Sequence, residues 1–182
     1  RHGFEEYGGD ILKRVKGMCQ RDGSLAFFYG RDGKPQGGGP PGWGAAAVAS
    51  ALMEGLAGIE DRSKLFGKVS LSPRWIALGV PEAEAVARYA ASGASFRYRF
   101  NHRPKAREIT VSWNGAPDSL TIHLLLPKGM EAKEAFVGGK PVAFENSLIE
   151  SSPYVELTLP AGKKAEETSL RVLYAAPEKP SG

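Results

Sequence analysis

The chain has 182 residues, of which 42% are apolar, and its 24 basic and 20 acidic residues give a formal net charge of +4. A chain of this length can bury one hydrophobic core, or one core with an appended fragment, but not two full domains. The charges are spread along the sequence without a run of five or six of one sign, so no nucleic-acid partner is indicated.

Cysteine and histidine usage argues against a metal or disulfide framework. The single Cys19 excludes an intramolecular disulfide, and its place in a helical pattern favours a small buried hydrophobe over a nucleophile. His2, His102 and His123 lie far apart and have no acidic or thiol partner at ligand spacing, so no metal site is predicted. The glycines at 37–39 neither follow a strand nor precede a Gly-Lys-Ser/Thr sequence, and we expect no cofactor.

Hydropathy indicates no membrane partner. No stretch approaches the roughly 18 continuous apolar residues that a membrane-spanning helix needs, and no signal peptide opens the chain. The chain begins with Arg1 rather than Met, and we therefore expect a piece of a longer polypeptide.

The first part of the chain has helical patterns separated by a loop. Apolar residues recur at helical spacing from Ile11 to Cys19, and Asp10 is a suitable N-cap. Glycine and proline dominate residues 22–41 and predict a long loop. A second helix is predicted from Trp43, with Gly58 placed to stop it. Because this helix is nearly uncharged, we expect it to be buried against neighbouring helices that this chain does not contain.

After residue 65 the apolar period changes to two, which is typical of strands. Phe96, Tyr98 and Phe100 alternate with Arg97 and Arg99, and similar alternation recurs to the end of the chain between Gly- and Asn-rich turns. The pattern predicts an antiparallel β-sandwich of about eight or nine strands. The expected organisation is a helical segment at 1–62, the sandwich at 63–176 and a tail at 177–182.

The order of these elements resembles a known junction. Residues 42–75, with Leu56, Gly58 and Ile59 in one phrase and Leu-Ser-Pro-Arg at 71–74 in the next, are similar to the join between the last helix of an (α/α)6 barrel and the C-terminal β-domain of six-hairpin glycosidases. These include α-L-rhamnosidase-like and glucosidase-like families. The stretch at 89–98 is also similar to the sandwich of these proteins.

The resemblance implies a fold class and a function. The expected fold is α+β by segment, with two or more helices finishing an (α/α)6 barrel and then the sandwich. The expected function is that of the C-terminal portion of a glycoside hydrolase acting on an oligo- or polysaccharide. Its expected partners are carbohydrate and the remaining N-terminal part of the same enzyme. The alternative is a non-catalytic carbohydrate-binding or protein-interaction module, because a sandwich alone implies neither function.

Glycoside hydrolysis normally uses two carboxylates, and the resemblance implies that only the base could lie in this chain. Glu5 and Glu6 are the candidates, because they lie between Phe4 and Tyr7, and a carboxylate beside aromatic surface suits a sugar site. The alternative is that they are solvated or favour a helix dipole. The aromatic stretch at 26–29 lacks the acidic residue that the related families lead us to expect there, which leaves the position of the base open.

Three aromatic residues beside the glycine-rich loop are candidates for substrate binding, namely Trp43, Tyr29 and Phe28. Aromatic faces pack on the C–H surfaces of sugars. Trp43 has an alternative role as a plug between helices.

Overall fold

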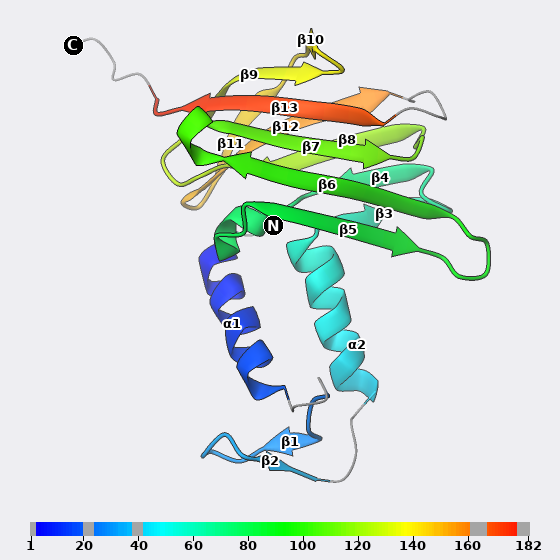
Figure 1. Ribbon diagram of the computed structural model, residues 1–182, viewed down its shortest axis with the longest axis vertical. Coiled ribbons are helices and arrows are strands. Elements are labelled where there is room, and N and C mark those ends of the chain that lie inside the picture. The colour runs from blue at the N-terminus through cyan, green and yellow to red at the C-terminus, as the bar shows by residue number, and fades with distance from the viewer. Residues whose placement is uncertain (1–2, 20–23, 38–41, 161–166, 178–182) are drawn as a thin grey trace.

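The computed structural model describes residues 3–19, 24–37, 42–160 and 167–177. Two helices extend side by side from one end of a pair of β-sheets, as Figure 1 shows. They are α1 (Glu5–Met18) and α2 (Gly42–Ser50), and α2 continues into a π-helical turn (Ala51–Leu56). A small hairpin of β1 (Phe28–Tyr29) and β2 (Pro35–Gln36) lies at the end of the helices remote from the sheets.

The larger sheet has six strands in the order β10-β9-β13-β7-β6-β5. Its strands are β5 (Glu82–Arg88), β6 (Ser95–Arg103), β7 (Glu108–Asn114), β9 (Glu131–Val137), β10 (Lys140–Pro141) and β13 (Thr168–Ala175). All of its neighbouring strands are antiparallel.

The smaller sheet has five strands in the order β11-β12-β8-β4-β3. Its strands are β3 (Ile59–Asp61), β4 (Lys68–Leu71), β8 (Ser119–Leu125), β11 (Glu145–Ile149) and β12 (Ser152–Pro160). The pair β4 and β8 is parallel, so the expectation of a wholly antiparallel sandwich is wrong at this point. These two strands are far apart in sequence. The alternation of apolar residues within a strand does not indicate whether a distant strand pairs with it in parallel or antiparallel.

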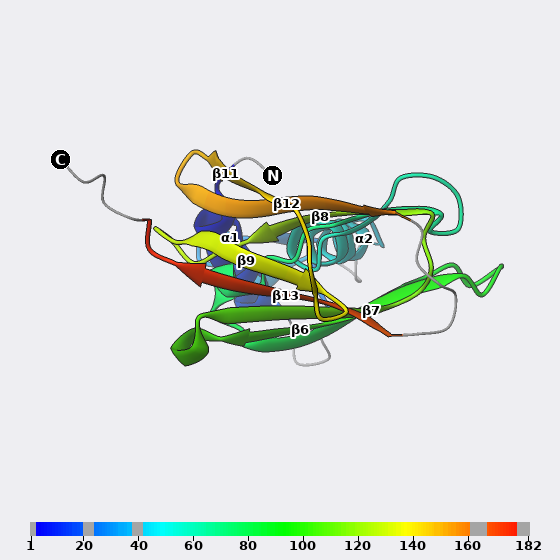
Figure 2. The same cartoon turned by 90° about the horizontal axis from the view of Figure 1, so that it is seen from above.

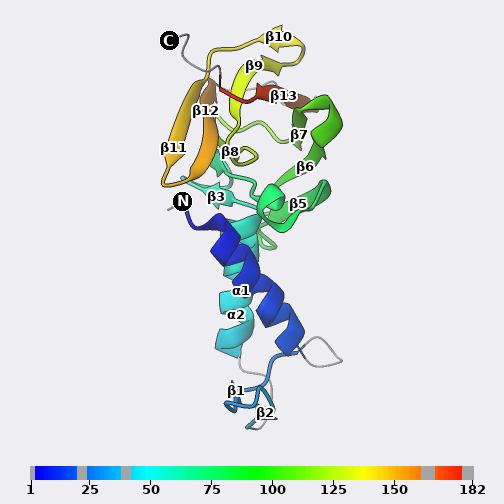
Figure 3. The same ribbon diagram turned by 90° about the vertical axis from the view of Figure 1, so that its left-hand side faces the viewer.

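The two sheets face each other and enclose the hydrophobic core, which Figures 2 and 3 show from two directions. Alternate residues of each strand point inward, as in β6, where Phe96, Tyr98 and Phe100 are buried and Arg97 and Arg99 are exposed. This alternation separates an apolar inner face from a polar outer face on each sheet.

The expected end of an (α/α)6 barrel is wrong. The part of the chain that the structure describes contains two α-helices, and strands in three sheets hold more of its residues than the helices do. Among the described residues, the two sandwich sheets hold eleven strands rather than eight or nine. Apolar residues at helical spacing predict that a helix has an apolar face, but they do not predict what covers that face. None of the described helices is long and apolar enough to cross a membrane.

The beginning of the first helix differs from the expectation, whereas the end of the second helix agrees with it. α1 begins at Glu5, so Asp10 lies inside the helix, where its carboxylate accepts a hydrogen bond of 2.9 Å from Arg14 Nε. The second helical run ends at Leu56, and Ile59 begins β3. Gly58 makes this turn possible, because its φ is +68°, a value that residues with a Cβ rarely adopt.

Gly58 also allows the helix end to approach the segment after β4. Its carbonyl accepts a hydrogen bond of 2.8 Å from the Ser72 amide, and a Cβ on Gly58 would lie 1.9 Å from the Ser72 carbonyl oxygen. No side chain can therefore be accommodated at this position without separating the two backbones.

We predict that Gly58→Ala destabilises the protein much more than Gly79→Ala does. Both glycines have a φ of +68°, but a Cβ on Gly79 meets nothing within 4 Å. Gly79→Ala should cost about 1 kcal/mol from backbone strain alone, whereas the clash at Gly58 should raise the cost above about 3 kcal/mol. Urea unfolding of both variants measures the difference, and equal losses would contradict the close approach.

Candidate functional site

The helices join the sandwich at Arg74, which precedes a 3-10 helix at Trp75–Leu78. The Arg74 side chain is only 7% exposed. Its Nη1 donates to the carbonyl oxygens of Gly55 at 2.7 Å and Ser72 at 3.2 Å, and its amide donates to the Leu56 carbonyl at 3.0 Å. A cation is favourable at this position, because the last carbonyls of a helix carry partial negative charge.

Glu5 meets Arg74 from the other helix. Arg74 Nε lies 3.9 Å from Glu5 Oε1, and the Glu5 side chain is only 4% exposed. Ser152 Oγ donates a 2.5 Å hydrogen bond to Glu5 Oε2, and the Tyr154 hydroxyl donates to Oε1. One carboxylate in the first turn of α1 thus contacts the smaller sheet directly and the end of the second helical run through Arg74.

The surroundings of Glu5 keep its carboxylate ionised. Burial alone would raise the pKa of Glu5, but the hydrogen bonds from Ser152 and Tyr154 outweigh burial and hold that pKa below its usual value. Burial, together with the neighbouring carboxylate, raises the pKa of the Tyr154 phenol, which therefore stays a donor. A general base needs a pKa close to the working pH, and this carboxylate is instead suited to holding a structure together.

Close packing of α1 accompanies this ion pair. A Cβ on Gly9 would lie 2.9 Å from Leu78 Cδ2, so the absence of a side chain allows α1 to pack against the 3-10 helix.

The ring of His123 stacks on the Tyr154 ring with centroids 3.9 Å apart. Burial lowers the pKa of His123, which favours a neutral ring on this side of the junction.

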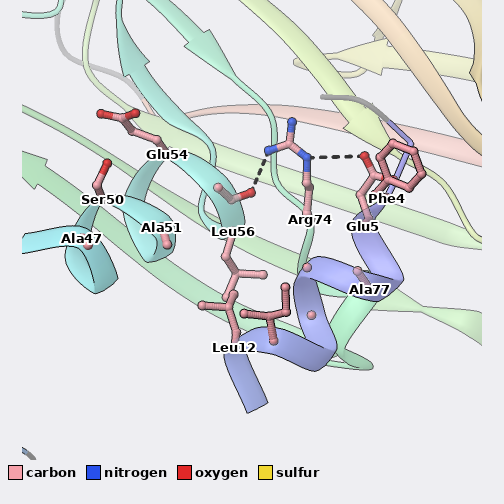
Figure 4. Close-up of a pocket in the computed structure, with 14 residues that line it drawn as sticks. Phe4, Glu5, Leu12, Ala47, Ser50, Ala51, Glu54, Leu56, Arg74 and Ala77 are labelled. Carbon is pink, nitrogen blue, oxygen red and sulfur yellow. Dashed lines mark hydrogen bonds and ion pairs between the residues drawn. The ribbon is translucent and has the colours of Figure 1, made fainter. Parts of the chain in front are cut away.

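A cavity of about 710 Å³ lies between the two helices. Figure 4 shows Glu5 and Arg74 at one side of it, with Ser50 and Glu54 on the other helical run. Most of its wall is apolar and includes Phe4, Leu12 and Leu56. The sequence prediction placed Glu5 beside aromatic surface, and Phe4 does line this cavity with it.

Glu6 points away from this junction. Its side chain is 79% exposed, and its nearest cation is Lys128 Nζ at 3.9 Å. The structure therefore places the two candidate carboxylates in opposite environments, one buried and fully engaged and the other in solvent.

The three candidate substrate-binding residues gather at the far end of the helices. The Phe27 ring lies 6.1 Å from both the Phe28 ring and the Trp43 ring, edge to face in each case. We call Phe27, Phe28 and Trp43 the aromatic tip. They are 48%, 52% and 66% exposed, respectively. The β1–β2 hairpin and the beginning of α2, which carry these exposed rings, lie away from the sandwich (Figure 1).

Tyr29 has a different place from Phe28 and Trp43. Its hydroxyl donates to the Met18 carbonyl at 2.7 Å and accepts from the Ala26 amide at 2.9 Å. It thereby ties the β1–β2 hairpin to the end of α1, so that it positions the aromatic tip.

The sequence analysis missed several residues of the junction. Arg74 stands in the Leu-Ser-Pro-Arg phrase that carried the resemblance, and this phrase was its only sequence signal. Ser152 and Tyr154 gave none, because they lie far along the chain in a strand of ordinary alternation.

Comparisons with known proteins find only weak structural similarity. No family model and no curated protein matches the chain. Among solved structures it is similar to a cycloalternan-forming enzyme from Listeria monocytogenes in complex with a pentasaccharide substrate, with a TM-score of 0.40 and 11% identity over 58% of this chain and 10% of that one. It is also similar to a GH127 β-L-arabinofuranosidase from Geobacillus stearothermophilus T6, with a TM-score of 0.40 and 12% identity over 95% of this chain and 28% of that one.

This chain therefore spans about a tenth and about a quarter of the two enzymes. Both act on saccharides, but similarity at this level carries no argument about what this chain does.

We predict that Glu5→Gln lowers stability at neutral pH by about 3 kcal/mol, because it leaves the buried Arg74 charge without its partner. Since the folded state lowers the pKa of Glu5, this contribution is present above the unfolded pKa and is lost as pH falls through the folded pKa. Wild type and variant should therefore converge in stability as the pH falls below the ordinary glutamate value of 4.5.

The matched control is Glu6→Gln, which removes an exposed charge and should cost less than about 0.5 kcal/mol. Chemical denaturation at a series of pH values measures all three proteins. A Glu5→Gln deficit that is the same at pH 7 and pH 3 would contradict the role of the carboxylate charge.

Proposed function

We propose that this chain is a saccharide-contacting, non-catalytic segment of a glycoside hydrolase. The observation that carries the proposal is the aromatic tip, three neighbouring rings with 48% to 66% of their surface exposed. Exposed aromatic clusters are uncommon on soluble surfaces, and ring faces suit the apolar C–H surfaces of sugars.

The contacts of Glu5 favour a structural role for this carboxylate over a catalytic one. A carboxylate that accepts bonds from Ser152 and Tyr154 beside Arg74 is already committed to structural contacts. In this proposal another part of the enzyme supplies the acid and the base. The assignment of Glu5 or Glu6 as the base stays a prediction, which the Gln variants test when kcat is measured beside stability in the intact enzyme.

We expect Trp43→Ala to weaken saccharide binding by about tenfold, because a stacking contact with an aromatic ring contributes on the order of 1 kcal/mol. Phe28→Ala should weaken binding less, since Phe28 is the less exposed of the two rings. Isothermal titration with a panel of neutral oligosaccharides measures the affinities.

Tyr7→Ala is the matched control, because Tyr7 is 68% exposed on α1 and lies outside the aromatic tip. If the Trp43 and Tyr7 variants lose the same affinity, or if neither loses affinity, the aromatic tip is not the saccharide-binding surface.

We also expect the isolated 182-residue chain to leave aryl glycosides unhydrolysed. A glycosidase normally needs two carboxylates at a set separation, and the junction offers one that is already engaged. Turnover above background that disappears in a Glu5→Gln or Glu6→Gln variant would show instead that a catalytic centre lies in this chain.

A further inference from the structure

The end of the molecule that carries the aromatic tip is positively charged. Residues 10–53 contain six basic and three acidic residues, so their net charge is +3, out of +4 for the whole chain. The stretch at 42–53 contributes no charge at all. The excess therefore lies on α1 and on the β1–β2 hairpin, which meet at the end remote from the sandwich (Figure 1).

Ion pairs within this region use only two of its described cations. Arg14 Nε lies 2.9 Å from the carboxylate of Asp10, and Lys34 Nζ lies 3.5 Å from that of Asp32. The other cations that the structure describes in this region are exposed, and their side chains form neither an ion pair nor a hydrogen bond with a described residue, namely Lys13, Lys16 and Arg31. Their charges are therefore available to a ligand.

Lys16 and Arg31 lie close to the hairpin that carries Phe28. The Tyr29 hydroxyl, which belongs to this hairpin, donates to the Met18 carbonyl at 2.7 Å. Lys16 lies two residues before Met18, and Arg31 lies two residues after Tyr29. Two residues of chain span at most about 7 Å. Both cations are therefore held at the same end of the molecule as the exposed rings.

The turn of the hairpin favours a ligand in water over a lipid surface. Residues 30–34 contain Arg31, Asp32 and Lys34 and no apolar side chain. Charged side chains are costly to place in hydrocarbon, so a hairpin with this turn is poorly suited to insertion into a bilayer. A polar ligand bound at the surface leaves these charges hydrated.

We propose that the aromatic tip binds a saccharide that carries carboxylate groups. Its rings pack on the C–H faces of the sugar, and Lys16 and Arg31 pair with the carboxylates. Arg31 suits a bidentate contact, because its guanidinium is planar and has no partner among the described residues. This inference rests on the proposed function, because it names the class of saccharide that the aromatic tip contacts.

The probes are an oligogalacturonate and its full methyl ester, which share one backbone and differ in carboxylate charge. We expect the acid to bind about tenfold more tightly than the ester, because each exposed ion pair contributes up to about fivefold in affinity and two cations take part. The preference should shrink as salt rises from about 50 to about 300 mM, since exposed charges are screened. Isothermal titration measures both affinities.

Substitutions of single cations locate the binding. Arg31→Gln and Lys16→Gln should each weaken binding of the acid about threefold and leave binding of the ester unchanged, because they remove a charge and keep a long polar side chain. Lys140→Gln is the matched control, since Lys140 is an exposed lysine on β10 at the opposite end of the molecule (Figure 1). It should change neither affinity. Thermal unfolding of each variant checks that the fold is retained.

Equal binding of acid and ester, or an equal loss in Arg31→Gln and Lys140→Gln, would overturn this inference. Vesicles that contain phosphatidylserine test the lipid alternative, and binding to them without a preference for the acid over the ester would also overturn it. Trp43→Ala separates the inference from the proposed function. If Trp43→Ala weakens binding of acid and ester while the two bind equally, the proposed function stands and the preference for carboxylates is wrong. If the cation variants lose affinity and Trp43→Ala loses none, the rings take no part and the proposed function fails.

Discussion

The buried contact between Glu5 and Arg74 determines where the helices stand on the sandwich. Each charge costs several kcal/mol to remove from water unless partners replace the water. Here the replacement is shared among three parts of the fold, because Arg74 bonds the end of the second helical run while Ser152 and Tyr154 bond Glu5 from β12. Neither helix could move relative to the smaller sheet without exposing a charge to an apolar surrounding or breaking one of these bonds.

The aromatic tip depends on that junction through α1. A 14-residue helix with glycine at 8, 9 and 17 is marginal on its own, so α1 needs its contacts with the sandwich. At its other end the Met18 carbonyl accepts the bond from Tyr29, which holds the hairpin that carries Phe27 and Phe28. A chain of specific contacts thus runs from the sandwich, through α1, to exposed rings at the opposite end of the molecule.

The spacing of apolar residues predicted individual strands, but it did not predict contacts between residues that are far apart in the sequence. The alternation around Phe96 to Phe100 predicts a half-buried strand, because period two is a property of neighbouring residues. The parallel pairing of β4 with β8 and the bonds from Ser152 and Tyr154 to Glu5 join residues that are remote in sequence, and no local period records them. The aromatic flanks that made Glu5 a candidate are equally compatible with an anchor and a base. Only its partners distinguish the two, and here they favour the anchor.

The aromatic tip and the sandwich differ in what they depend on. The aromatic tip requires the contacts of Glu5 and Arg74, whereas the register of strands such as β6, β7 and β13 is set by the sheet itself. Loss of the Glu5 contact should therefore disturb the aromatic tip and leave the sandwich in place, because the hydrophobic core contains no residue of α1. The position of the exposed rings is thus set by the contacts of Glu5, while the sandwich is held by its own core.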